Sequence, residues 1–162
     1  NNGGGIYAER GGTIIDVVIS NNTSQQKGAG IYVLYRALTI NNVLIRNNSG
    51  GSSAYYLYSS LAPSSIQNCT ITQNDTQSGV YIDTDGDIDI MNTIVINNNG
   101  DELYEGYNSG DINVNYSNIA GEWDGDGNIN LNPLFCNPDD NDFSLANIVA
   151  DNQVKDDVPP SV

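Results

Sequence analysis

Two short acidic segments contain the residues whose type and spacing best suit metal binding. The first places four carboxylates at alternate positions around a glycine turn: Asp83, Asp85, Asp87 and Asp89. The second also alternates with glycine: Asp124, Asp126 and Asn128. Ca²⁺ binds about six to eight oxygen ligands, and short Asp/Gly loops supply them. Both segments are therefore candidate calcium sites. Because neither completes an EF-hand, ordinary acidic corners are the alternative.

Two arginines, Arg10 and Arg36, are candidates for contact with an anionic sugar. If the chain repeats with the spacing between them, both lie on one face of neighbouring repeat units. The position one period further on is close to Ala62, so the basic stripe ends there. The alternative is that both side chains simply point into solvent.

Tyrosines recur at one position of the same repeat. The row consists of Tyr7, Tyr32, Tyr81 and Tyr104, with Leu57 in the remaining place. An exposed row of aromatic rings suits stacking against sugars or contact with another protein. Packing of the rings against one another on the face of a sheet is the alternative.

The residue types present give little support for catalysis. The chain has no histidine, which excludes Ser-His-Asp and Cys-His chemistry. Glycoside hydrolysis needs a positioned pair of carboxylates, and the adjacent Asp139 and Asp140 fit an ordinary turn. No arginine or lysine lies among carboxylates in a set that predicts a lyase. We therefore expect no catalytic residues, and a carbohydrate-active enzyme is the alternative.

Three series of positions recur along the chain and predict how these side chains are placed. The first consists of Ile6, Ile31, Tyr56, Val80 and Leu103. The second consists of Asp16, Asn42, Asn68, Asn92 and Asn115. The third consists of Asn22, Asn48, Asn74 and Asn98. All three series advance by about 25 residues at each step, and such a period is typical of solenoid proteins.

The series predict an all-β solenoid of about five coils, each with three short strands separated by turns. One coil cannot bury its own apolar face, so stacking of coils in parallel creates the core. Because alternate side chains point inward, we expect one internal stack of Ile19, Ile45, Ile71 and Val95. A neighbouring stack consists of Val17, Val43, Cys69 and Thr93. Asparagine suits the corners, where it adopts left-handed conformations and forms ladders of hydrogen bonds along the axis.

The segments GGGIY and VISNN (3–7 and 18–22), GAGIY and LIRNN (28–32 and 44–48) and IQNCTITQN (66–74) resemble right-handed parallel β-helix repeat proteins. That superfamily includes pectate-lyase-like enzymes and surface adhesins. The segments YSNI, GNI, NPLF and DFSL (116–119, 127–129, 132–135 and 142–145) resemble the closing part of bacterial secreted members. The resemblance implies a right-handed β-helix in an extracellular or cell-surface protein. It stops after Leu145, where such proteins often continue with a different run.

The two ends of the chain differ. Asn1-Asn2 resembles the end of a preceding coil, because Asn21-Asn22 and Asn47-Asn48 also close coils. An uncapped end exposes strand edges, so we expect self-association or contact with adjoining coils there. Residues 1–120 are expected to form the coils, 121–146 a C-terminal cap region, and 147–162 a tail or linker.

Composition limits the partners. The formal net charge is −15, with 5 basic and 20 acidic residues, which disfavours binding to nucleic acid. No apolar run is long enough to cross a bilayer, so we expect no membrane insertion. The preferred interpretation is a non-catalytic structural or adhesive segment, with self-assembly into filaments through the N-terminal coil. The alternative is a β-helix that binds or cleaves polysaccharide.

Overall fold

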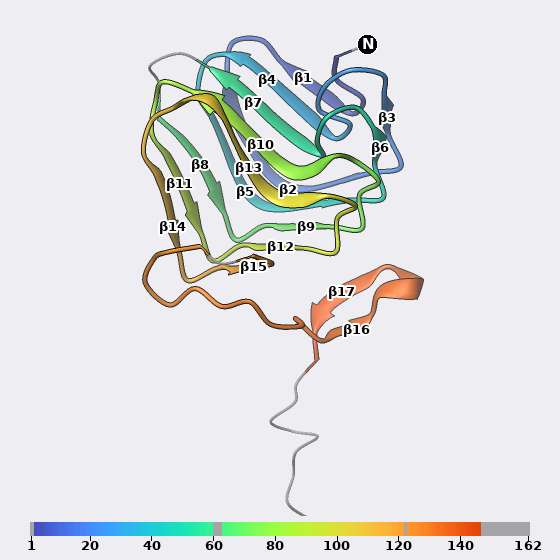
Figure 1. The fold of residues 1–162 in the computed structure, drawn as a ribbon. Coiled ribbons are helices and arrows are strands. Elements are labelled where there is room, and N and C mark those ends of the chain that lie inside the picture. Colours follow the sequence, from blue (N-terminus) through green and yellow to red (C-terminus); the bar gives the residue numbers. More distant parts are fainter. Residues whose placement is uncertain (1, 60–62, 122, 147–162) are drawn as a thin grey trace, which may run out of the picture. The chain divides into compact units, whose positions relative to one another are not determined.

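The computed structural model describes residues 2–59, 63–121 and 123–146, in two compact units that divide after Leu131. The first unit is a parallel β-solenoid, whose strands follow the repeat (Figure 1). One wall is a five-stranded parallel sheet, named sheet A here. Its strands, in stacking order, are β1 (Ile6–Ala8), β4 (Ile31–Tyr35), β7 (Tyr55–Ser59), β10 (Ser78–Thr84) and β13 (Asp101–Ser109).

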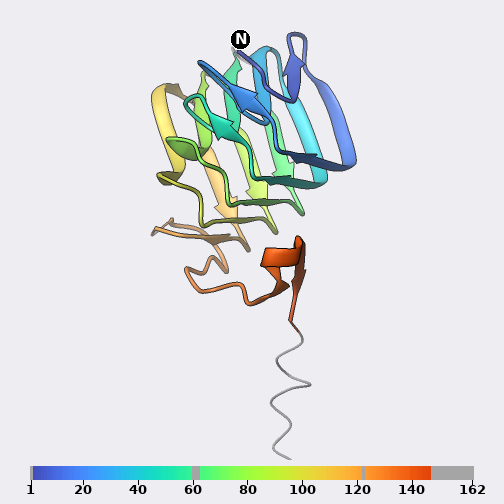
Figure 2. The ribbon, with the colours of Figure 1, turned by 90° about the vertical axis from the view of Figure 1, so that its right-hand side faces the viewer.

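The other wall is an eight-stranded parallel sheet, named sheet B, that bends across the molecule (Figure 2). Its strands are β2 (Gly12–Ser20), β5 (Leu38–Arg46), β8 (Ser64–Gln67), β9 (Thr70–Thr72), β11 (Ile88–Met91), β12 (Ile94–Ile96), β14 (Ile112–Asn115) and β15 (Asn118–Ile119). A two-stranded parallel sheet, β3 (Thr23–Ser24) with β6 (Ser49–Gly50), lies at one corner.

The all-β solenoid is confirmed, but it has about four turns instead of five. Five stacked strands in sheet A enclose four complete turns, because the first and last repeats each contribute only part of a turn. The number of repeat positions in the sequence equals the number of stacked strands, which is one more than the number of turns between them.

The interior is filled by aliphatic rows whose members come from successive coils. Ile19 pairs in register with Ile45, Ile45 with Ile71, and Ile71 with Val95, as the repeat predicts. All four are at most 4% exposed. Each isoleucine buried in this way contributes roughly 1.5–3 kcal/mol relative to an exposed one, so the stacked rows supply the main driving force for folding.

A ladder of asparagine amides runs inside the solenoid, parallel to its axis. Nδ2 of Asn22, Asn48 and Asn74 donates to Oδ1 of the next asparagine, at 3.0, 3.0 and 2.7 Å, and the series ends at Asn98. The backbone N–H of each donor residue reaches the same oxygen, at 3.0, 3.0 and 3.2 Å. The side chains of Asn48 and Asn74 are 0% and 1% exposed, so these bonds satisfy polar groups that have no access to water.

The ladder ends on a carboxylate. Glu102 accepts hydrogen bonds from the backbone N–H of Asn98 at 3.2 Å and from its Nδ2 at 2.6 Å. Because Val80 pairs with Leu103, Glu102 occupies the position that Gly79 has in the coil before. A Cβ on Gly79 would lie 2.7 Å from Nδ2 of Asn98, so glycine is required where the ladder continues and glutamate fits where it stops.

The second asparagine series lies at an exposed corner and forms a less regular ladder. Asp16, Asn42, Asn68 and Asn92 adopt φ values of 50° to 58°, as expected of corner residues. Nδ2 of Asn42 donates to Asp16, and Nδ2 of Asn92 donates to Asn68 at 3.4 Å, but Asn68 donates to Asn41. Placing Asn115 in this series was wrong, because Asn115 pairs with Met91. Its neighbour Tyr116, with a φ of 50°, therefore occupies the left-handed corner position of the last coil, and the step from Asn92 is one residue longer than the series assumed.

A buried row of polar side chains leads to the C-terminal end of the first unit. The N–H of Cys69 donates to Oγ1 of Thr93, and the N–H of Thr93 donates to Oγ of Ser117. The N–H of Ser117 then donates to Oδ1 of Asn128 at 3.0 Å. Asn128 thus ends this row as Glu102 ends the asparagine ladder, and Trp123 packs nearby against the apolar core.

The second unit contains an antiparallel pair, β16 (Phe135–Asn137) and β17 (Asp142–Leu145), joined by the 3₁₀ helix η1 (Pro138–Asp140). The rings of Phe135 and Phe143 pack edge to face with centroids 5.2 Å apart. The predicted cap region, 121–146, therefore spans parts of both units. The predicted tail or linker, 147–162, lies outside the described residues.

We expect Asn74→Ala to lower the free energy of unfolding by roughly 2–4 kcal/mol, because it leaves buried donors and acceptors on neighbouring coils unpaired. Asn99→Ala is the matched control: Asn99 donates to Asp75 at 2.8 Å on the exposed surface, and its loss should change stability by about 0.5 kcal/mol or less. Urea denaturation of both variants tests this, and equal effects would contradict an internal ladder.

Burial, the largest effect, raises the pKa of Glu102 above its ordinary value of 4.5, although Asn98 donates to it. A carboxyl whose pKa is raised on folding stabilises the fold below the unfolded pKa and loses that contribution as the pH rises. We therefore expect the stability of Glu102→Gln to improve relative to the natural protein as pH increases above 4.5. Parallel stability curves for the two proteins would show that Glu102 does not titrate in this way.

Candidate functional site

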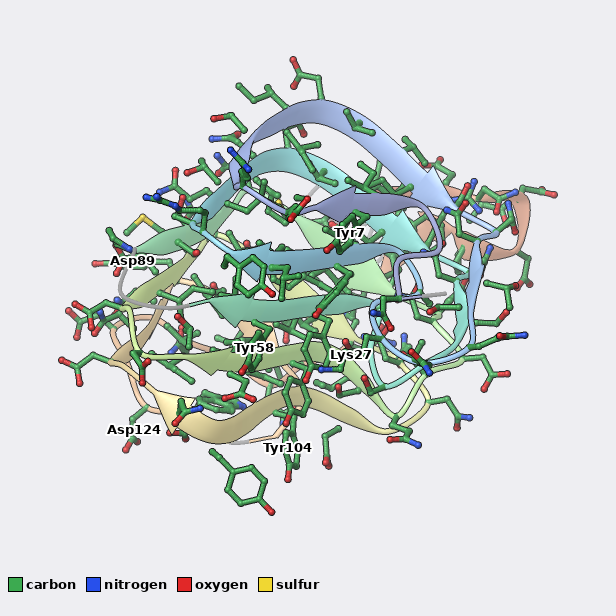
Figure 3. All side chains as sticks on the ribbon, turned by 90° about the horizontal axis from the view of Figure 1, so that it is seen from above. Tyr7, Lys27, Tyr58, Asp89, Tyr104 and Asp124 are labelled. Atoms are coloured by element: carbon green, nitrogen blue, oxygen red, sulfur yellow. The ribbon has the colours of Figure 1, made fainter. Side chains whose placement is uncertain are left out.

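The outer face of sheet A carries a continuous row of tyrosines. The register of the strands aligns one from each coil: Tyr7, Tyr32, Tyr56, Tyr81 and Tyr104. Figure 3 views the molecule from above, with Tyr7, Tyr58 and Tyr104 on this face. The row lies on short strands held by the core beneath them, so its ring positions are fixed by the solenoid.

Placing Leu57 in this row was wrong, because Tyr56 occupies the position. Tyr55 pairs with Ile31 and with Val80, so Tyr55 points into the core and Tyr56 points outward. Leu57 is 0% exposed and belongs to the core. The step from Tyr32 to Tyr56 is one residue shorter than the step from Tyr7 to Tyr32. Assuming equal steps places the third coil one residue too late, and a slip of one residue reverses inside and outside.

The rings bury much of their surface by packing against one another. Tyr56 and Tyr81 stack with centroids 4.4 Å apart and planes 7° apart, and Tyr81 stacks on Tyr104 at 5.1 Å and 16°. Tyr32 and Tyr56 are only 4% and 5% exposed. Each such pair adds about 0.5–1.5 kcal/mol beyond area burial. The middle of the row therefore stabilises the sheet, and ring surface is available mainly near its two ends, where Tyr7 and Tyr104 are 50% and 45% exposed.

Lys27 covers the middle of the row. Its Nζ lies 5.8 Å from the ring centroid of Tyr32, 4.7 Å from that of Tyr56 and 5.2 Å from that of Tyr58. These distances are typical of cation–π contacts. The sequence analysis did not identify Lys27. Its only signal there is its position shortly before Gly30, in the loop that leads into the next tyrosine-bearing strand.

Burial raises the pKa of hydroxyls in the middle of the row. Burial, together with neighbouring tyrosines, raises the pKa of Tyr32 to about 12. Burial also raises the pKa of Tyr81 to about 12, with smaller contributions from Tyr56 and from the carboxylate of Asp83. The middle of the row is therefore a neutral aromatic surface with the carboxylate of Asp83 close to it.

A shallow pocket of about 250 Å³ lies at the C-terminal end of the row. Two of its residues are the stacked Tyr81 and Tyr104. The others carry hydroxyl, amide and carboxylate groups: Ser52, Gln77, Ser78 and Asp101. The sequence analysis identified the two tyrosines but not the polar residues, because those come from three different coils.

Arg10 and Arg36 occupy equivalent places in adjacent coils, as predicted. Both follow a strand of sheet A and precede a strand of sheet B, in which Gly12 pairs with Leu38. Both side chains are exposed. They lie beyond the opposite end of the strands from the loop of Lys27, so the three cations do not form one cluster.

The carboxylates of the first acidic segment are bound to different neighbours. Oδ1 of Asp83 is largely buried and accepts from the N–H and the Nδ2 of Asn108, each at 3.1 Å. Oδ1 of Asp87 accepts from the N–H of Asp111 at 3.1 Å. Asp85 is exposed, and Asp89, which Figure 3 shows at the edge of the molecule, accepts from Nδ2 of Asn113 at 3.2 Å.

The second acidic segment is held by its backbone. Nδ2 of Asn128 donates to the carbonyl of Val114 at 2.8 Å and to that of Asp124 at 3.3 Å. The N–H of Asp126 donates to Oδ1 of Asn115 at 2.9 Å. Asn128 is thus a structural link between this loop and the last coil, while the carboxylates of Asp124 and Asp126 face outward and are exposed.

Comparison with known proteins now adds the family. The profile described as "Right handed beta helix region" matches residues 1–131. The chain belongs to this family. The right-handed parallel β-helix expected from the sequence is therefore confirmed. Searches of the curated proteins and of the solved structures gave no significant match. Family membership establishes the fold and leaves activity and ligand to be argued from the surface.

Two further observations concern metals and membranes. In residues 2–59, 63–121 and 123–146, no group of three or more His, Cys, Asp or Glu side chains is placed to hold a metal ion. Over the same part of the chain, no helix has the length and hydrophobicity needed to cross a membrane.

Calcium binding at either acidic segment stays a prediction. If it occurs, excess Ca²⁺ should raise the melting temperature relative to EDTA, because a ligand that binds only the folded state stabilises it. Asp87→Asn and Asp124→Asn should each remove part of that increase if both loops bind the ion. Identical melting temperatures with Ca²⁺ and with EDTA would contradict the prediction.

Proposed function

We propose that this chain is a rigid, non-catalytic structural or adhesive segment of an extracellular or cell-surface protein. The observation that carries the proposal is that two ladders link each coil to the next along the whole solenoid. One is the internal asparagine ladder, which ends at Glu102. The other is the tyrosine row on the outside of sheet A. Contacts that repeat along the axis oppose bending between coils, which suits a stalk or matrix component.

The N-terminal edge is the proposed surface for self-association or for contact with adjoining coils. Ile6 and Val17 are only partly buried, whereas Ile31 and Val43, their partners in the next coil, are 0% and 1% exposed. Within the described residues, β1 and β2 pair on one side only. Unpaired strand edges beside apolar surface favour addition of another strand.

The asparagine ladder restricts how such a partner binds. No donor among the described residues reaches Oδ1 of Asn22, whereas the equivalent oxygen of Asn48 accepts two N–H groups. The opposite end of the ladder is the carboxylate of Glu102, which is also an acceptor. Association between copies therefore depends on the strand edges and the apolar surface, and the ladder does not continue from one copy to the next.

Mass photometry and electron microscopy of the purified chain at increasing concentration test the association. We expect larger species to increase with concentration, and Ala8→Lys to suppress them by placing a charge on the half-buried edge. Asn99→Lys makes the same charge change at an exposed corner and should leave association unchanged. A single monomeric species at every concentration would contradict self-association.

Polysaccharide binding on the outer face of sheet A is a second candidate function. The pocket beside Tyr104 favours it, because aromatic rings combined with hydroxyl, amide and carboxylate groups match the apolar faces and hydroxyl groups of a sugar. This function requires no catalytic group, so it is compatible with the structural role.

A further inference from the structure

Lys27 shows how this face interacts with a cation. Its ammonium group lies within 5.8 Å of three ring centroids, and it is closest to Tyr56, at 4.7 Å. The faces of aromatic rings carry partial negative charge and attract ammonium groups, and this is how aromatic sites recognise cationic ligands. In the middle of the tyrosine row, the chain therefore supplies the cation itself.

The pocket at the other end of the row has similar chemistry without a cation. Its aromatic part is the stacked pair Tyr81 and Tyr104, and Asp101 adds an exposed carboxylate. No lysine or arginine belongs to the described residues that line it. A carboxylate beside tyrosine rings, on a chain with a net charge of −15, attracts positive ligands and repels anionic sugars.

The remaining polar groups fit a ligand that also carries hydroxyls. Gln77 is exposed and offers an amide, while Ser78 is held by a bond from its Oγ to the carbonyl of Ser52 at 3.1 Å. Oγ of Ser52 is buried and has no hydrogen-bond partner among the described residues. Because Ser52 lines the pocket, rotation of its side chain toward the pocket would let this hydroxyl bond to a ligand there. A volume of about 250 Å³ is below the range of drug-sized sites and suits one sugar ring.

We propose that this pocket binds one amino-sugar residue with a free, protonated amino group, as part of a polysaccharide. The ammonium group pairs with Asp101 and the ring of Tyr104, as Lys27 pairs with Tyr56, and the sugar hydroxyls contact Gln77 and the two serines. This inference rests on the second candidate function and gives it a ligand class. It differs from the expectation that Arg10 and Arg36 contact an anionic sugar, because it concerns another place and the opposite charge.

Isothermal titration at mildly acidic pH, with three oligosaccharides of equal length, tests the proposal. The probes are oligomers of glucosamine, of N-acetylglucosamine and of glucose. We expect the glucosamine oligomer to bind about tenfold or more tightly than the other two, since a tenfold change corresponds to one interaction of about 1.4 kcal/mol. Equal binding of all three would overturn the amino-group assignment but keep polysaccharide binding. Binding of none would overturn both.

Two charge-matched variants separate the pocket from general attraction to an acidic protein. Asp101→Asn should weaken glucosamine-oligomer binding about tenfold. Asp111→Asn removes one exposed carboxylate elsewhere and should leave binding nearly unchanged. The proposal would be overturned if both variants weakened glucosamine-oligomer binding equally, or if neither variant weakened it. Circular dichroism and melting temperature confirm that both variants are folded.

Discussion

The internal asparagine ladder is the interaction on which the rest of the structure depends. Every corner of a solenoid brings backbone groups into the interior, and these must find partners away from water. Asn48 and Asn74 each satisfy carbonyl groups of their own coil and of the coil before, besides donating to the next asparagine. The ladder thus fixes the distance and register between coils. The aliphatic rows and the tyrosine row then repeat at the same spacing.

The ladder also explains where the repeat ends. Each asparagine both accepts and donates, so the series continues until a residue that only accepts takes the next place. Glu102 does so with its carboxylate. Asn128 ends the buried polar row differently: its Oδ1 accepts from Ser117, while its Nδ2 donates to carbonyls of Val114 and of its own loop. In the sequence, Glu102 looks like a surface residue and Asn128 was predicted as a calcium ligand, so neither structural role is evident there. Each ends its row because, within the part of the chain that the structure describes, no residue of a later coil continues the row.

The tyrosine row stabilises sheet A and, at its C-terminal end, borders the pocket that is proposed to bind a sugar. In its middle, the stacked rings and Lys27 leave little aromatic area uncovered, which favours the packing interpretation there. At its C-terminal end the stack stops beside polar residues, and a pocket remains. The proposed binding role is therefore local. It arises where the repeat loses its regularity, as expected for a scaffold in which function lies on loops and ends.

The sequence by itself determined the fold class, the family and the inward-facing rows, because a recurring period and the alternation of side chains constrain a solenoid strongly. It also located the internal asparagine series, the corner series except at Asn115, and four of the five tyrosines. Only the tertiary structure decided that Tyr56 replaces Leu57, that Lys27 covers the row, and that residues of three coils form the pocket beside Tyr104. Loop lengths vary between coils, so one residue decides whether a side chain faces the core or solvent, and side chains distant in sequence meet only once the coils are stacked.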